Sequence, residues 1–424
     1  MRKERLGVWG LALVMGISLM GCGGGSGKDS ANSEKEKNPD SGEKQVVKCI
    51  IQGEGFDKYF HDIAKQLEEK GSPYTYDIEC VSLDNLDEKI NLAHASGEDY
   101  DFIMVNNSSV LQFYNAGVLA PLDDFMTKHT EIKENYGESL LNVGVVDGTS
   151  YALPIAPGSR ILAYNKKLLE GAGYSAPTSQ EEIMEIAKAL SKDGVYAFAR
   201  QMDTSLAPAY VEGCFWMANG AAIAKDEGGK ILASCDSQEM IESVKWWKEM
   251  TAYMPDDINM SASQVRAMFE QNQLLFYVFG PWEFTQMSGM EYGVDYELML
   301  TPGSKGYGST LGGWYVGVGA DSDCKEGALA MIEQSILPEN IVVMNEGVPA
   351  DNRCYDMEPF NSEQYKVFME SMEYTTVPFP ITANFNEIND LFFEYFNACL
   401  MDDSDIEQKL KECNEKIQEM LDEA

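Results

Sequence analysis

Two tryptophans stand at breaks in the backbone pattern rather than within apolar faces. Trp282 follows Gly280 and Pro281 where a buried-strand pattern ends, and Trp314 follows Gly313. Core tryptophans are normally embedded in periodic apolar sequence, as the pair at 246–247 is. A flat amphipathic ring beside exposed backbone suits stacking on the apolar face of a pyranose, whose hydroxyls then bond to carboxylates, amides and arginine. We therefore expect Trp282, Gly313 and Trp314 to contact a ligand.

Polar residues at the ends of predicted strands are candidate partners for these rings. Each alone is typical of a solvated surface side chain, but ligands collect at the carboxyl ends of strands in open α/β sheets. Because they share this position, six residues become candidate ligand contacts: Glu54, Asn107, Ser108, Ser109, Glu283 and Arg353.

Signatures of catalysis and of metal binding are missing from the sequence. There is no G-x-S-x-G, H-E-x-x-H, G-x-x-x-x-G-K-[ST] or EF-hand spacing, and no G-x-G-x-x-G follows the first predicted strand. Three histidines in the chain leave little room for a histidine-rich metal site. The acidic stretch 402–405 is better explained as the cap of the last helix. We predict no catalytic residue, no cofactor and no metal, although two carboxylates of a glycosidase would escape such a search.

The elements that position these residues follow an α/β pattern. Strands are predicted at Val46–Ile51, Tyr74–Val81 and Phe102–Val105, separated by a helix over 56–70 and a second helix capped by Asp84 and closed by Gly97. Buried strands alternating with helices imply a parallel sheet with right-handed crossovers.

A second α/β segment begins near residue 161. It contains strand patterns at 161–164, 195–199 and 274–279, and a helix over 178–190 in which Thr178 and Glu181 fit a capping box. The tail from residue 363 to 424 is almost wholly helical in pattern. A chain of 424 residues exceeds the size at which one core keeps growing, so two lobes are expected.

The charge balance limits the partners. Sixty-nine acidic against 32 basic residues give a formal net charge of −37. This excludes nucleic-acid binding by phosphate neutralisation and charge-driven docking on anionic lipid.

The first 45 residues predict export and anchoring. A basic start is followed by an apolar run from Leu6 to Met20, too short to span a bilayer, as in a secretory signal. The run ends in a segment that resembles the bacterial lipobox, with Cys22 as the lipidated residue and 1–21 as the signal peptide. Residues 22–45 lack apolar periodicity and predict a flexible tether.

Eight further cysteines are scattered without C-x-x-C spacing. Cys49 and Cys80 fall in the first two predicted strands and are one possible disulfide pair. The alternative is a set of buried thiols that behave as small hydrophobic groups.

Taken in order, these segments resemble the family 1 extracellular solute-binding proteins, the maltose-binding-protein-like sugar receptors of bacterial ABC importers. The resemblance covers 46–424. Its segments are 100–105 with 115–123, 148–154 with 162–169, Gly280-Pro281-Trp282, Pro302 to Gly312-Gly313-Trp314, and Val348-Pro349-Ala350 before a closing helix pair.

The resemblance implies an α/β, two-lobed periplasmic-binding-protein-like fold of type 2, each lobe a mainly parallel sheet flanked by helices. The lobes would be discontinuous, 46–155 with 302–350 and 160–300 with 355–424, and joined by a hinge that closes on ligand. It also implies ligand contacts at Asn107 to Ser109, Tyr210, Trp282 and the Gly313-Trp314 turn, with Tyr151 and Ser159 beside the crossing strand. Ser108-Ser109 and Gly158 stand where maltodextrin receptors carry charged residues, so maltose itself is not the expected ligand.

By this resemblance, the function is capture of a carbohydrate, expected to be an oligosaccharide, and its delivery to the permease subunits of an ABC transporter. The protein would be a monomer held by its lipid at the outer face of the cytoplasmic membrane of a Gram-positive bacterium. A receptor for a non-sugar solute such as a polyamine and a secreted glycoside-processing enzyme are the alternatives.

Replacing the lipidation residue tests the anchoring prediction. Cys22→Ala should release the protein from membranes or leave its signal uncut, because the acyl chains supply the membrane affinity. Fractionation and mass spectrometry check this, and an unmodified mature start at another residue would contradict it.

Overall fold

The structure is a computed structural model that describes residues 44–53, 55–202, 207–256, 260–344, 347–402 and 405–423. The predictions for the signal peptide, for Cys22 and for Glu54 lie outside the described residues. Within the described part, no helix is both long enough and apolar enough to cross a bilayer.

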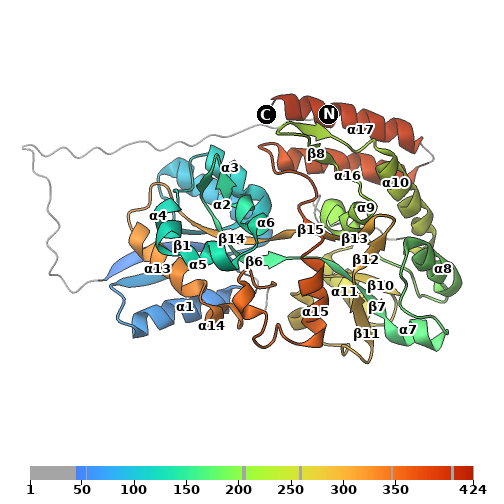
Figure 1. Cartoon of the computed structure of the whole chain (residues 1–424), viewed down its shortest axis with the longest axis horizontal. Helices are drawn as coiled ribbons and strands as arrows, with labels where there is room; N and C mark the ends of the chain where they lie inside the picture. Colours follow the sequence, from blue (N-terminus) through green and yellow to red (C-terminus); the bar gives the residue numbers. More distant parts are fainter. Residues whose placement is uncertain are drawn as a thin grey trace, which may run out of the picture. The chain divides into compact units, whose positions relative to one another are not determined.

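The first sheet has five strands in the order β2-β1-β3-β14-β6 (Figure 1). Their bounds are β1 Gln45–Gln52, β2 Tyr74–Val81, β3 Phe102–Asn106, β6 Leu153–Gly158 and β14 Gly312–Val318. The strands β2, β1 and β3 are parallel, as predicted, whereas β14 is antiparallel to both β3 and β6. Strand β14 therefore brings a segment from late in the chain into the centre of the sheet.

Helices cover both faces of the first sheet. On one face α1 (Asp57–Glu69) packs with α13 (Lys325–Ser335), and on the other lie α2 (Leu83–Ser96) and α3 (Val110–Asn115). Strand β3 is consequently buried along its first four residues.

The second sheet has three strands, in the order β10-β7-β11. Strands β10 (Phe276–Phe279) and β11 (Tyr296–Met299) are both antiparallel to the central β7 (Ile161–Asn165). The expectation of a mainly parallel sheet is wrong for this ladder, where one isolated parallel bridge joins Tyr196 to Leu274. Strands buried on both faces have continuous apolar sequence whichever way they run, so the sequence pattern does not distinguish the two cases.

Two long helices of the C-terminal tail pack against each other and against α10. The red helices α16 (Phe385–Met401) and α17 (Ile406–Glu423) lie side by side next to α10 (Gln238–Met250) in Figure 1. Their apolar faces share one core with Trp216 and Trp247, which are both buried. Trp246 is partly exposed and donates its Nε1–H to the Gln180 carbonyl at 3.2 Å, so this pair packs within the fold as predicted.

The remaining elements are short or lie at the periphery. They are α4 Asp123–Lys128, α5 Thr130–Asn135, α6 Glu138–Val143, β4 Val145–Val146, β5 Thr149–Ser150, α7 Lys166–Gly171, α8 Gln180–Leu190, η2 Pro208–Glu212, α9 Gly213–Ala218, β8 Ala224–Asp226, β9 Ile231–Ala233, η3 Thr251–Tyr253, α11 Ala262–Glu270, α12 Glu283–Gln286, β12 Thr301–Gly303, β13 Gly306–Thr310, α14 Pro338–Ile341, η1 Asn107–Ser109, η4 Asn352–Cys354, α15 Glu363–Ser371 and β15 Thr375–Thr376.

Helix boundaries differ from prediction by about one residue, as is usual for helix ends. Helix α2 begins at Leu83, so Asp84 lies inside it, and Gly97 ends it with a left-handed φ of 73°. At α8 the cap is Ser179, whose Oγ accepts from the Glu182 N–H at 3.2 Å, rather than Thr178 with Glu181. Asp405 caps α17 as predicted, accepting from the N–H groups of residues 407 and 408.

All eight cysteines of the described part are free. Cys49 is buried and Cys80 is exposed, and the Cys80 Sγ–H donates to Asp57 Oδ1 at 3.2 Å. The possible disulfide between Cys49 and Cys80 does not form.

Only Ser159 and Arg160 separate β6 of the first sheet from β7 of the second. Four buried hydroxyl groups surround this crossing. The Ser371 Oγ–H donates to Ser159 Oγ at 2.8 Å, and the Thr375 Oγ1–H donates to Ser309 Oγ at 2.9 Å. Ser309 Oγ also accepts from the Arg160 N–H at 3.2 Å. The crossing backbone is therefore held by hydroxyls of β13 and the α15–β15 segment.

Helix α9 lies close against β12 and β13 because glycines face it. A Cβ at Gly308 would lie 2.2 Å from the Cys214 carbonyl oxygen, and one at Gly303 would lie 2.5 Å from Ala218. This close approach fixes the helical segment that carries Tyr210.

Adding one methyl group at that contact tests its tightness. Gly308→Ala should lower the free energy of unfolding by about 1–3 kcal/mol, because the backbone of α9 must move. Gly171→Ala is the control, since a Cβ there meets no atom within 4 Å and should change stability by less than about 1 kcal/mol. Denaturant titration measures both, and equal stability of the two variants would contradict the close packing.

Candidate ligand-binding site

The loop after β3 presents three polar residues in one turn. Asn106 ends the strand and its Oδ1 accepts from both the N–H and the Oγ–H of Ser108, at 3.2 and 2.9 Å. This cap starts the short helix η1, in which Asn107, Ser108 and Ser109 are all buried. The loop therefore has a fixed shape rather than freely solvated side chains.

Trp314 is placed by the strand pairing on both sides of β14. It lies opposite Asn106 of β3 and Ala156 of β6, and the register shifts after it. Gly313 before it has a φ of 126°, and a Cβ there would lie 2.5 Å from the Ala156 carbonyl oxygen. Only glycine fits this position, so the bend that turns the half-exposed indole toward the loop depends on it.

Tyr210 reaches the same loop from the other side. Its hydroxyl accepts from Asn107 Nδ2 at 3.4 Å, and its carbonyl accepts from Thr310 Oγ1–H at 2.6 Å. Burial raises the pKa of Tyr210 to about 12, although Asn107 and Arg160 oppose the shift. The phenol is therefore neutral at physiological pH. The Asn107 Oδ1 is buried with no partner among the described residues.

Arg160, which sequence reasoning did not select, lies between two aromatic rings. Its guanidinium carbon is 5.1 Å from the ring centre of Tyr210 and 5.2 Å from that of Trp282. Burial lowers the pKa of Arg160 from its usual value. A guanidinium is not deprotonated in proteins, so Arg160 is a cation.

Trp282 is held by glycines and by a carboxylate. Its indole covers Gly280, where a Cβ would come within 2.2 Å, and lies 3.2 Å from the Cβ position of Gly158. Its Nε1–H donates to Glu283 Oε1 at 3.0 Å. Glu283 also accepts from the Tyr277 hydroxyl and from Arg266. The carboxylate of Glu283 is thus engaged within the protein and orients Trp282.

A cavity of about 430 Å³ unites these groups. Six residues predicted from sequence line it: Asn107, Ser108, Ser109, Tyr210, Gly313 and Trp314. A larger hollow of about 740 Å³ lies beside β2 and α2, but its residues all come from the stretch 48–100 and none is a predicted site residue. The 430 Å³ cavity instead joins residues of β3 and β14 in the first sheet, Arg160 of the link between the sheets, Tyr210 of η2, and two residues of α16.

The other predicted residues lie outside the lining of this cavity. Trp282 contacts Arg160, which lines the cavity. Glu283 accepts hydrogen bonds from Trp282, Tyr277 and Arg266. Ser159 is fully buried against Ser371. Tyr151 packs edge-on to Tyr114 at 4.8 Å between ring centres. Arg353 pairs with Asp351 at 2.9 Å.

Six polar lining residues were missed by sequence reasoning: Asp87, Asn106, Arg160, Gln201, Asn386 and Asp390. Asn386 and Asp390 are four residues apart on α16, a spacing that places both on one face. Arg160 had a usable signal, because it directly follows the crossing strand. Together the lining offers aromatic faces, amides, hydroxyls, carboxylates and one guanidinium, and no described lining residue is a histidine.

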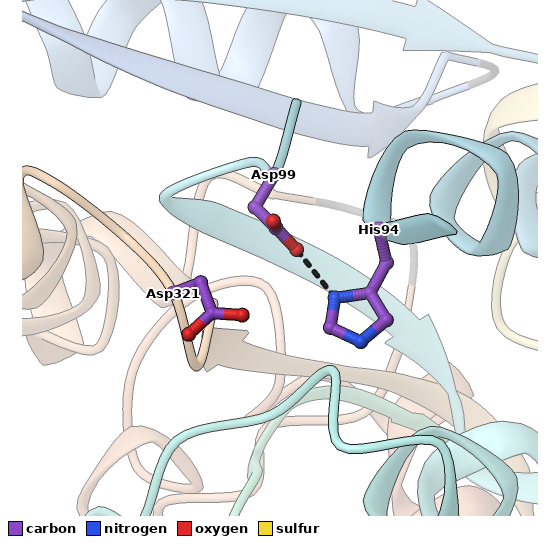
Figure 2. Close-up of side chains that lie close together, drawn as sticks. All are labelled: His94, Asp99 and Asp321. Carbon is purple, nitrogen blue, oxygen red and sulfur yellow. Dashed lines mark hydrogen bonds and ion pairs between the residues drawn. The ribbon is translucent and has the colours of Figure 1, made fainter. Parts of the chain in front are cut away.

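One group of side chains elsewhere has the composition of a metal site. His94, Asp99 and Asp321 have ligand atoms within 4.8 Å of one another (Figure 2). The dashed contact in Figure 2 joins His94 Nδ1 to Asp99 Oδ1 at 2.6 Å, which leaves only Nε2 of that ring for a metal. The His94–Asp99 contact ties the last turn of α2 to the loop before β3, which is a sufficient structural role.

Asp87 gives the site a pH dependence. Burial raises the pKa of Asp87, and the hydrogen bond from Ser109 Oγ–H only partly opposes the shift. The folded protein then holds this proton more tightly than the unfolded chain, so Asp87 costs stability as pH rises above the ordinary value of about 3.9. Asp87→Asn should melt at a higher temperature than the parent at pH 7, with the difference vanishing toward pH 3. Glu88→Gln, on the exposed part of α2, should follow the parent at both pH values. A lower melting temperature for Asp87→Asn at pH 7 would contradict the cost.

Known proteins resemble this chain in sequence and in fold. A family described as bacterial extracellular solute-binding protein matches residues 53–339. A binding protein of Brucella abortus (strain 2308) is 27% identical over 247 residues, 56% of this chain and 58% of the relative. The chain thus spans little more than half of that relative's length. The diacetylchitobiose binding protein DasA of Streptomyces coelicolor is 24% identical over 339 residues, 76% of this chain and 75% of that protein.

A solved structure of an ABC transporter solute-binding protein from Thermotoga lettingae, bound with α-D-tagatose, has a TM-score of 0.78. The two chains are 20% identical, and the match covers 89% of this chain and 100% of the other. The predicted α/β fold of two-lobed binding proteins is therefore confirmed. The matching proteins are binding proteins rather than enzymes, and the chain belongs to the bacterial extracellular solute-binding proteins.

Proposed function

We propose that the protein captures a carbohydrate, an oligosaccharide rather than a single sugar, and delivers it to the permease of an ABC transporter. One observation carries the proposal: a 430 Å³ cavity that Trp314 lines together with the amide and hydroxyl residues of the β3 loop. A half-exposed indole beside such groups is the arrangement that a pyranose requires. The names of similar proteins that bind diacetylchitobiose and α-D-tagatose support a carbohydrate ligand, and diacetylchitobiose is a disaccharide.

The proposed lobes are 46–155 with 302–350 and 160–300 with 355–424. Ligand contacts from both lobes would favour a closed state over an open one, because the ligand binds the closed arrangement more tightly. The two-residue link between β6 and β7 is short enough to act as one of the hinge segments.

The proposal includes the membrane. Acylation at Cys22 would hold a monomer at the outer face of a Gram-positive cytoplasmic membrane, next to its permease subunits. The residues 22–45 would act as the tether.

A polyamine is the second candidate ligand. Asp87 and Asp390 in the cavity favour it, since carboxylates attract amines. Arg160 opposes it, because a cation in the same cavity repels a polycation.

A thermal-shift panel of neutral glycans, acidic glycans and polyamines tests the proposal. Binding of a ligand to the folded state raises the melting temperature by mass action. A shift with glycans alone supports a sugar receptor, and a shift with spermidine or putrescine alone would overturn it.

Trp314 should dominate the affinity for a sugar. Trp314→Ala is expected to cost about 2–4 kcal/mol of binding, or about 30- to 1000-fold in Kd, through loss of the stacking surface. Trp282→Ala should also weaken binding, because its ring positions Arg160.

Trp246→Ala is the matched control. This indole is away from the cavity, so its loss should lower the melting temperature and leave Kd nearly unchanged. Calorimetric titration and melting curves on the three variants decide the ranking. Unchanged affinity in both Trp282→Ala and Trp314→Ala would mean that these residues only pack.

A further inference from the structure

Four arginines lie in the described part of the chain, and three of them have a carboxylate partner. Arg200 Nε is 2.7 Å from Glu212, Arg353 Nε is 2.9 Å from Asp351, and Arg266 donates two hydrogen bonds to Glu283. Arg160 has no ion pair and no side-chain hydrogen bond to any described residue, and its Nη1 is buried without a partner. It is also the one among them that both lacks a partner and lines the 430 Å³ cavity.

This isolation is unexpected from the composition. The protein has 69 acidic residues against 32 basic ones, so carboxylates are abundant. Among the described residues, the groups that act electrostatically on the Arg160 guanidinium are nevertheless Cys214, Tyr210 and Tyr277, and none is a carboxylate. A buried charge is costly unless it is paired. Within the part of the chain that the structure describes, the charge of Arg160 is therefore not compensated.

The surroundings of Arg160 hold its position but do not satisfy its donors. The rings of Tyr210 and Trp282 attract the cation, while the N–H groups of a guanidinium lie in its plane and need acceptors. Gly312 leaves room for the head group, since a Cβ there would lie 3.1 Å from Arg160 Nη1. A planar donor group fixed in this way matches the geometry of a carboxylate.

A second unsatisfied atom lies near Tyr210. Asn107 donates to the Tyr210 hydroxyl through Nδ2, and its Oδ1 is a buried acceptor without a partner among the described residues. The described residues of the cavity thus supply neither an anion for Arg160 nor a donor, such as a hydroxyl, for Asn107. A sugar acid carries both groups on one ring.

We propose that the ligand is an acidic glycan whose carboxylate, as in a uronic acid, pairs with Arg160 while a ring hydroxyl donates to Asn107. This inference rests on the proposed carbohydrate function and narrows its ligand class. Asp87 and Asp390 then accept from hydroxyls of the ligand that lie away from the carboxylate.

Matched pairs of sugars test the proposal by calorimetric titration of the purified protein. The monosaccharide pairs are galacturonate with galactose and glucuronate with glucose. The disaccharide probes are digalacturonate and a glucuronate-terminated disaccharide, and each is compared with the neutral disaccharide of the same linkage. At least one acidic member should bind about tenfold or more tightly than its neutral counterpart, since charge-assisted hydrogen bonds exceed neutral ones by that margin. The preference should weaken as salt concentration rises.

Variants then locate the preference. Arg160→Gln should bring the acidic and neutral members of a pair to similar affinities, and Arg160→Lys should restore part of the difference. Lys245→Gln removes one positive charge at an exposed ion pair with Glu407 and should leave the preference intact.

The outcomes separate this inference from the function on which it rests. Neutral members that bind as tightly as acidic ones would overturn the acidic ligand and leave the sugar receptor standing. Binding of spermidine with no binding of any glycan would overturn the sugar receptor itself. The comparison within each pair needs only the parent protein, so it stands even where an Arg160 variant fails to fold.

Discussion

The two-residue link between β6 and β7 constrains most of what surrounds it. A chain that leaves one sheet and enters the next within two residues must bring the ends of both sheets together. The main apolar core is accordingly continuous, with Ile155 of β6 and Ile161 of β7 in the same cluster. The link also delivers Arg160 to the place where the two sheets meet, and that place is where the cavity forms.

Glycine residues and aromatic side chains together determine the shape of this cavity. Glycines at 158, 280 and 312 leave the space that the indole of Trp282 and the guanidinium of Arg160 occupy. The bend at Gly313 turns Trp314 toward the β3 loop. Trp282 and Trp314 are therefore both oriented by backbone that lacks a side chain.

The sequence predicted the parts of the molecule that local pattern determines. The run of strands and helices from β1 to β3 followed from apolar periodicity. Trp314 was selected because it follows a glycine pair, and the Asn107 loop because it ends a strand; both line the 430 Å³ cavity. The antiparallel second sheet was missed because doubly buried strands have the same apolar run in either direction. Arg160 could have been selected from its position directly after the crossing strand, but its lack of a partner among the described residues is visible only in the folded chain. Glu283 was taken for a ligand contact, but its acceptors are used by Trp282, Tyr277 and Arg266.

The hydroxyl groups at the crossing have a mechanical consequence. Ser159, Ser309, Ser371 and Thr375 are buried and bonded to one another in pairs, with Ser309 also bonded to the crossing backbone. A hydroxyl donates and accepts, and its hydrogen turns about the C–O bond at little cost. During a small backbone rotation, such hydroxyl groups can exchange hydrogen-bond partners, so that no buried polar atom is left without one. An ion pair or a row of backbone hydrogen bonds would have to break in the same rotation. The hydrogen bonds that fix the geometry of the crossing therefore resist small rotations of its backbone only weakly.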